Sequence, residues 1–171
     1  MKMRFAMGAL ALLMAASVGV ATAGAAPKAG PTAKVVGKVK INKDGTATVK
    51  AHYLCSGGGW HLWVSAKQAE GGVRDDAITG GGSGFGHVAT AWLQQHPTTH
   101  RCDGKWHTQK FVIDTTEMGV DENGNPFGPV GYGHLVPGVA YVQFCLTNDN
   151  GTPSDESDDQ FAIDQSWHKV R

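Results

Sequence analysis

Short runs of alternating apolar and polar residues, separated by turn signals, constrain this chain more than any other feature. The clearest run, TATVKAHYLC, spans residues 46–55. Its odd-numbered positions share one face: Ala47, Val49, Ala51, Tyr53 and Cys55. A period of two is that of a strand with one buried face, and no segment after residue 25 has a convincing apolar period of 3.6. The pattern therefore predicts an all-β chain.

Other runs of this kind follow one another along the sequence. They occupy residues 34–41, 60–68, 87–95, 105–114, 138–147 and 160–170. The turn signal NKDGT joins the 34–41 run to the 46–55 run and predicts a hairpin. Glycine and proline break residues 70–87 and 115–137, which we expect to be loops. About seven short strands with turns between them predict a β-sandwich of immunoglobulin-like size.

The N-terminus predicts export. Lys2 and Arg4 precede an uncharged apolar run, and small residues suited to cleavage follow it. We expect residues 1–25 to be a signal peptide helix, residues 26–33 a disordered leader, and residues 34–171 a single β-sandwich domain. Removing the signal peptide removes two of 15 basic residues against 15 acidic ones, so the net charge becomes about −2. This balance argues against a nucleic-acid binder.

Three cysteines, Cys55, Cys102 and Cys145, would enter an oxidising compartment after export, where a disulfide is expected. We favour the Cys55–Cys102 pair, because Cys102 stands at the entrance of a strand near the end of the 46–55 run. The alternative is Cys55–Cys145, which would resemble the bridge between sheets of immunoglobulin domains. Strand parity places Cys145 opposite Phe144 and Leu146, pointing away from the core, as expected for the unpaired thiol.

Three segments carry a resemblance: HYLCSGGGWHLWVSAKQ, CDGKWHTQKF and GVAYVQFCLT. Over about residues 35–147 the chain resembles a group of small secreted actinobacterial proteins of uncharacterised function, similar to the DUF6299 class of domains. The resemblance implies an exported β-sandwich and implies no activity and no functional residues. The chain departs from the group in its third cysteine and in a longer glycine-rich insert.

The stretch THRCDGKWHTQKFVID, residues 99–114, contains the most suggestive chemistry. Histidines at 96, 100 and 107 flank Cys102 and Asp103, but no second pair of zinc ligands accompanies them. Five residues of extended chain would hold Cys102 and His107 roughly 16 Å apart, too far for a catalytic pair. We therefore predict no catalytic residue, no metal site and no cofactor, and interpret the stretch as a disulfide anchor.

The functional prediction follows from these exclusions. We expect a secreted, non-enzymatic β-sandwich that acts as an extracellular interaction module, with another extracellular or cell-surface protein as partner. No nucleic acid and, after signal cleavage, no membrane is expected to bind. The alternative is an extracellular inhibitor or small-ligand-binding domain that presents the glycine-rich loops. A third possibility is a hydrolase assembled in space, for example from His134 and Asp121.

Overall fold

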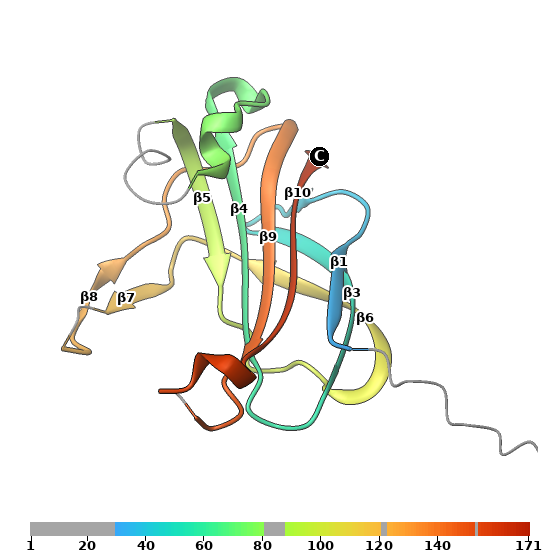
Figure 1. The fold of residues 1–171 in the computed structure, drawn as a ribbon. Coiled ribbons are helices and arrows are strands. Elements are labelled where there is room, and N and C mark those ends of the chain that lie inside the picture. The colour runs from blue at the N-terminus through green and yellow to red at the C-terminus, as the bar shows by residue number, and fades with distance from the viewer. Residues whose placement is uncertain (1–29, 81–87, 121–122, 153) are drawn as a thin grey trace, which may run out of the picture.

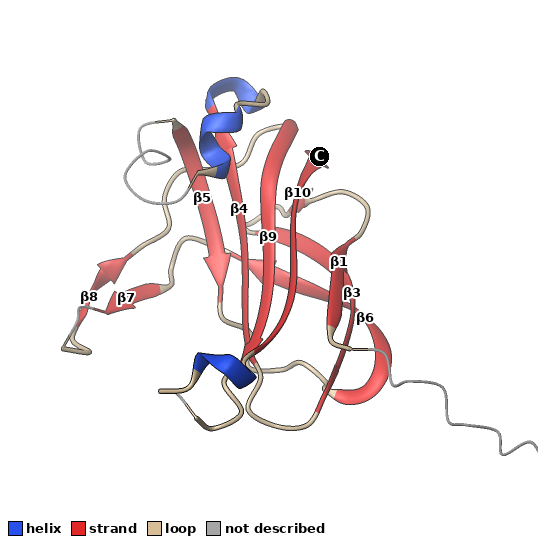
Figure 2. Cartoon of the chain, viewed as in Figure 1, coloured by secondary structure: helices blue, strands red, loops and turns tan. Residues whose placement is uncertain are grey.

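The fold is all-β, as the alternating runs predict. The computed structural model describes residues 30–80, 88–120, 123–152 and 154–171. Across these ranges the chain forms strands and short 3₁₀ turns but no α-helix (Figures 1 and 2). None of their helical turns is long and apolar enough to cross a membrane. The predicted signal peptide lies outside the described residues.

Two antiparallel sheets form the body of the molecule. The first sheet contains β1 (Thr32–Val35), β2 (Lys40–Ile41), β3 (Ala47–Ser56) and β6 (Asp103–Ile113). The second has the order β10 (Gln160–Val170), β9 (Gly138–Asn148), β4 (His61–Ala69) and β5 (Ala89–Gln95). Figure 1 shows β3 and β6 passing behind the second sheet. The arrangement is a β-sandwich.

The core lies between the faces that alternation identified. All five odd-numbered positions of the 46–55 run are buried, with Tyr53 fully excluded from solvent. Tyr53 of β3 and Phe111 of β6, both in the first sheet, meet Phe144 of β9 in the second, and the three ring centroids lie 5.5–6.2 Å apart. Tilted contacts at this range are favourable for aromatic rings. These three rings therefore connect the sheets near the end that carries the disulfide.

The predicted hairpin of the 34–41 and 46–55 runs is present but interrupted. Strands β1 and β2 lie one after the other along the same edge of β3. Between them the chain leaves β3, and Val39 forms a parallel bridge with Val170 of β10. Gln94 of β5 and Asp114 form a bridge on the other side of the sandwich. Both bridges connect the two sheets. The second involves Asp114, the residue that follows the end of β6.

Two predicted boundaries need correction. Residues 115–137 were expected to lack regular structure, but β7 (Met118–Val120) and β8 (Pro126–Pro129) pair as a small hairpin that projects from the body (Figure 1). Strand β1 begins at Thr32, so residues 32 and 33 belong to the sheet rather than to the predicted leader. All three strands depend on pairing with a neighbour, and a single run of sequence does not show which neighbour it will have.

The glycine-rich stretch after β4 is partly ordered by local bonds. Two 3₁₀ turns, η1 (Glu70–Gly72) and η2 (Asp76–Thr79), follow β4, and a third, η4 (Glu156–Asp158), lies in the acidic loop before β10. Asp75 caps η2 by accepting a bond from the Ala77 amide. Ile78 is fully buried. The remainder of this predicted loop, residues 81–87, lies outside the described residues.

Candidate functional site

Cys55 and Cys102 form the disulfide, which confirms the favoured pairing and overturns the Cys55–Cys145 alternative. The bridge joins the end of β3 to the residue before β6, with the two Cα atoms 4.5 Å apart. Cys145 is the free cysteine. It lies on the outer face of β9, opposite buried Phe144 and Leu146, as strand parity predicted. Burial raises the pKa of its thiol, so the protonated form predominates near neutral pH.

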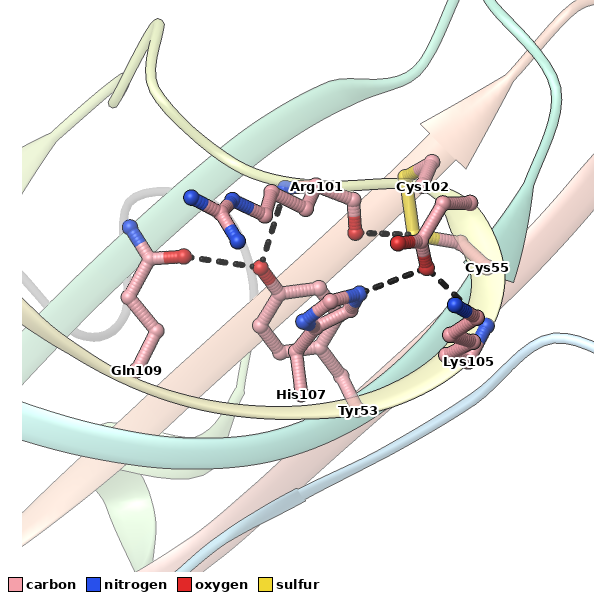
Figure 3. A network of polar contacts seen from close by, with 8 residues as sticks. Tyr53, Cys55, Arg101, Cys102, Lys105, His107 and Gln109 are labelled. Atoms are coloured by element: carbon pink, nitrogen blue, oxygen red, sulfur yellow. Dashed lines mark hydrogen bonds and ion pairs between the residues drawn. A yellow bond between two sulfur atoms is a disulfide. The ribbon is translucent and has the colours of Figure 1, made fainter.

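The chain curls tightly after Cys102. Gly104 has φ +77°, a conformation that other residues rarely adopt, and the Asp103 carboxylate accepts a bond from the Lys105 amide at 3.1 Å. The same carboxylate lies 2.7 Å from His107 Nε2, and this hydrogen bond lowers the pKa of Asp103. We expected extended chain between residues 102 and 107. The curl brings the carboxylate of Asp103 and the imidazole of His107 together instead (Figure 3).

Tyr53 connects this turn to the core. Its hydroxyl donates to Gln109 Oε1 at 2.8 Å and accepts a bond from the Arg101 amide at 3.2 Å. Figure 3 shows the His107 ring beside the Tyr53 ring, with the disulfide at the curled end of β6. Cys55 Sγ lies 3.5 Å from the Arg101 carbonyl; because a disulfide sulfur carries no proton, this is a packing contact. The disulfide and Tyr53 together position residues 101–109.

Two adjoining hollows lie along β6 and form a groove. The first, of about 460 Å³, is lined by Thr99, His100, Arg101, His107, Thr108 and Gln109. The second, of about 330 Å³, is lined by residues 95–99 and 109–112. Thr99 and Gln109 belong to both, and Gln109 Nε2 donates to the Thr99 carbonyl at 2.6 Å. We call residues 95–101 and 107–112 the β6 groove.

Strand β6 has one strand partner, β3, in the part of the chain that the structure describes. Backbone bonds to the neighbouring segment begin only at Asp114, which exchanges bonds with Gln94. The second edge of β6 therefore faces the groove with its backbone groups unpaired by any described strand. Long open edges of this kind are sites where another extended chain can pair.

The electrostatic character of the β6 groove is cationic. Arg101 and Lys110 are exposed, and neither forms an ion pair among the residues that are described. Glu117 is paired with His96. The ring of His61 stands 4.7 Å from that of His96. The pKa of His61 is lowered, first by desolvation and then by the charges of His96 and His100.

Three of the histidines that invited a metal interpretation have other polar partners. His107 bonds to Asp103, His96 to Glu117, and His100 Nδ1 lies 3.3 Å from the Pro97 carbonyl. Within the described ranges no group of three or more His, Cys, Asp or Glu side chains could hold a metal ion. Asp121, the suggested partner of His134, lies outside the described residues.

One polar pair was missed by sequence reasoning. His168 Nδ1 donates to the Gly37 carbonyl at 2.9 Å, and its Nε2 accepts from the Ser166 hydroxyl at 2.9 Å. The alternation of β10 places both side chains on one face, but Gly37 is distant in sequence. Neither side chain lines the β6 groove. The pair therefore joins β10 to the segment between β1 and β2.

Fold and site define a class: a disulfide-bridged β-sandwich with a cationic groove beside an open strand edge. Comparison with known proteins finds no matching family model, no matching curated protein and no matching solved structure.

Proposed function

We propose that this protein is a non-enzymatic extracellular interaction module, which binds an extended segment of a partner protein along β6. The observation that carries the proposal is the open edge of β6 beside the β6 groove. An added strand would pair its backbone with β6, and its alternate side chains would enter the two hollows. It would replace the bond between Gln109 and Thr99 that now crosses the groove. The exposed charges of Arg101 and Lys110 favour a neutral or acidic segment.

The chemistry around the groove supports a role in binding. Both cysteines at this end are joined in the disulfide, so neither is a nucleophile. The pair of Asp103 and His107 has the geometry of a base and its orienting group. No serine, threonine or cysteine bonds to His107 among the described residues. Because no such nucleophile bonds to His107, we infer that the pair of Asp103 and His107 holds the turn after Cys102 in place rather than taking part in catalysis.

Secretion of the protein and its resemblance to the DUF6299 class are also part of the proposal. The disulfide supports folding in an oxidising compartment, and the N-terminal sequence has the order of basic, apolar and small residues expected of a signal peptide. The resemblance to the DUF6299 class agrees with this localisation. We also propose that the sandwich is immunoglobulin-like. The strand orders β1–β3–β6 and β10–β9–β4–β5 support this, since they correspond to A–B–E and G–F–C–C′.

Selection of peptides tests the β6 groove. A library of displayed decapeptides is selected against the wild-type protein, and bound peptides are then tested on Thr99→Trp, which fills both hollows. We expect enriched peptides to bind the wild type and Thr152→Trp, a matched change on the exposed acidic loop, but not Thr99→Trp. Hydrogen exchange should show protection of β6 amides on binding. Failure to enrich any peptide, or protection of β10 instead of β6, would contradict the proposal.

The alternative role as an inhibitor has one observation in its favour. The β7–β8 hairpin projects from the body, and its Phe127 and Met118 side chains are 64% and 53% exposed. Exposed apolar side chains on a projecting hairpin can enter a partner's cleft. This role predicts inhibition of extracellular proteases that Phe127→Ala abolishes and Thr99→Trp leaves unchanged.

A further inference from the structure

Five lysines cluster at the outer face of the first sheet, and among the described residues that line the hollow between them none is acidic. They are Lys34, Lys38, Lys40, Lys50 and Lys110. The register places four of them on this face, since Lys34 pairs with His52, Lys40 with Thr48 and Lys50 with Lys110, and the alternate residues of β3 are buried. Lys38, in the segment between β1 and β2, lines a hollow together with Lys40, Lys50 and Lys110. None of the five forms an ion pair within the described ranges. We call these residues the lysine face.

Two details show that folding alone does not explain this cluster. Lys50 stands directly opposite Lys110 in the register of β3 and β6, where like charges are destabilising. Lysines on edge strands discourage aggregation, but Lys50 lies on β3, the central strand of its sheet. Lys38, Lys40, Lys50 and Lys110 also surround a hollow of about 230 Å³ beside Gly37. The charges therefore converge on one place at the surface.

An exposed aromatic ring adjoins the lysines. Trp106 of β6 is 51% exposed and stacks on His52, with ring centroids 4.4 Å apart and planes 5° apart. His52 is held by a contact of 2.8 Å between its Nδ1 and the Thr108 hydroxyl. His52 pairs with Lys34 across β1 and β3, so the stacked rings lie beside the lysines on the same face. A flat ring fixed in this way offers its electron-rich face to C–H groups of a ligand.

We propose that the lysine face, together with Trp106, binds a linear anionic polysaccharide. Charge complementarity selects the occupant: five uncompensated ammonium groups match acidic groups repeated along a chain, and the lysine stems adapt to their spacing. Trp106 adds a surface on which a sugar ring stacks. The inference goes beyond the protein-binding role proposed for the β6 groove, because it uses the outer face of the sheet, which shares Lys110 with the groove, and a different ligand class.

Calorimetry with defined polymers tests the inference on the purified chain. Polygalacturonate is the anionic glycan probe, dextran the neutral glycan, polyglutamate the anion without sugar, and oligothymidylate the nucleic acid. We expect polygalacturonate to bind at low ionic strength, to weaken as salt increases, and to exceed the other three in affinity. The double variant Lys50→Gln/Lys110→Gln should weaken binding roughly tenfold, from two lost charge contacts.

Matched variants separate this site from general electrostatics. Lys43→Gln/Lys169→Gln removes the same charge from exposed positions off the lysine face and should change affinity less than about twofold. Trp106→Ala should weaken polygalacturonate binding and leave polyglutamate binding unchanged. Thermal unfolding verifies that each variant is folded. The proposal is overturned if polygalacturonate does not bind, if both double variants lose affinity equally, or if oligothymidylate or dextran binds as tightly.

Discussion

Removing the disulfide should be the most costly covalent change to this fold. The double variant Cys55→Ala/Cys102→Ala releases a cross-link between residues separated by 47 positions. On the chain-entropy model, closing a loop of that length lowers the unfolded-state entropy by about 14 cal/mol/K, or about 4 kcal/mol at 25 °C. Since the free energy of unfolding of a domain is roughly 5–15 kcal/mol, the variant should still fold but should lose much of its stability.

Urea unfolding followed by tryptophan fluorescence measures this loss. We expect the free energy of unfolding to fall by about 4 kcal/mol. The m-value should rise, because the unfolded chain without a cross-link exposes more surface. Cys145→Ala, which removes the half-buried free thiol, is the matched control and should cost less than about 1.5 kcal/mol. A loss below about 1 kcal/mol in the double variant, or an equal loss in the control, would refute the entropic reasoning.

Three further outcomes follow from the packing and the titrating groups. Phe144→Ala should destabilise the protein by about 3–5 kcal/mol in urea unfolding, because the ring is fully buried, whereas Phe161→Ala, at an exposed position, should cost under about 0.5 kcal/mol. Intact protein should react slowly with Ellman's reagent at pH 7, since the pKa of Cys145 is raised, and should show one reactive thiol once unfolded; a fast native reaction would contradict its burial. The pKa of His61 is lowered below its ordinary value of 6.5, so the unfolded state binds the proton more readily. The stability that neutral His61 contributes is therefore present above pH 6.5 and is lost as the pH falls toward the lowered pKa of the folded state. In thermal unfolding between pH 7 and pH 5, His61→Asn should reduce the fall in unfolding temperature with decreasing pH.

Strand positions were predictable because burial on one face leaves a period of two in the sequence. The odd-numbered positions of the 46–55 run are buried as alternation required, and so are Ala140, Val142, Phe144 and Leu146 of the 138–147 run. Strands that form mainly through pairing with a neighbour show a weaker alternating pattern in the sequence. The β7–β8 hairpin was missed because glycine and proline interrupt it, and its two strands are three and four residues long.

The candidate site was only partly predictable. The sequence indicated a disulfide anchor at Cys102, which the structure confirms, and predicted extended chain from residue 102 to residue 107, which is wrong. It did not show that Gly104 curls the chain until Asp103 meets His107, because a positive φ depends on the surrounding structure as well as on the residue. The β6 groove was also invisible, since its two walls come from segments that the fold places side by side.

The amino-acid sequence by itself determined that the chain is all-β, which strand faces are buried, and that Cys145 points away from the core. These properties are local, because each depends on neighbours one or two positions along the chain. The tertiary structure decided which cysteines pair, which edge of β6 stays open, and that Lys50 and Lys110 stand opposite each other. Those features depend on register and on the packing of segments far apart in sequence, which no single run of residues specifies.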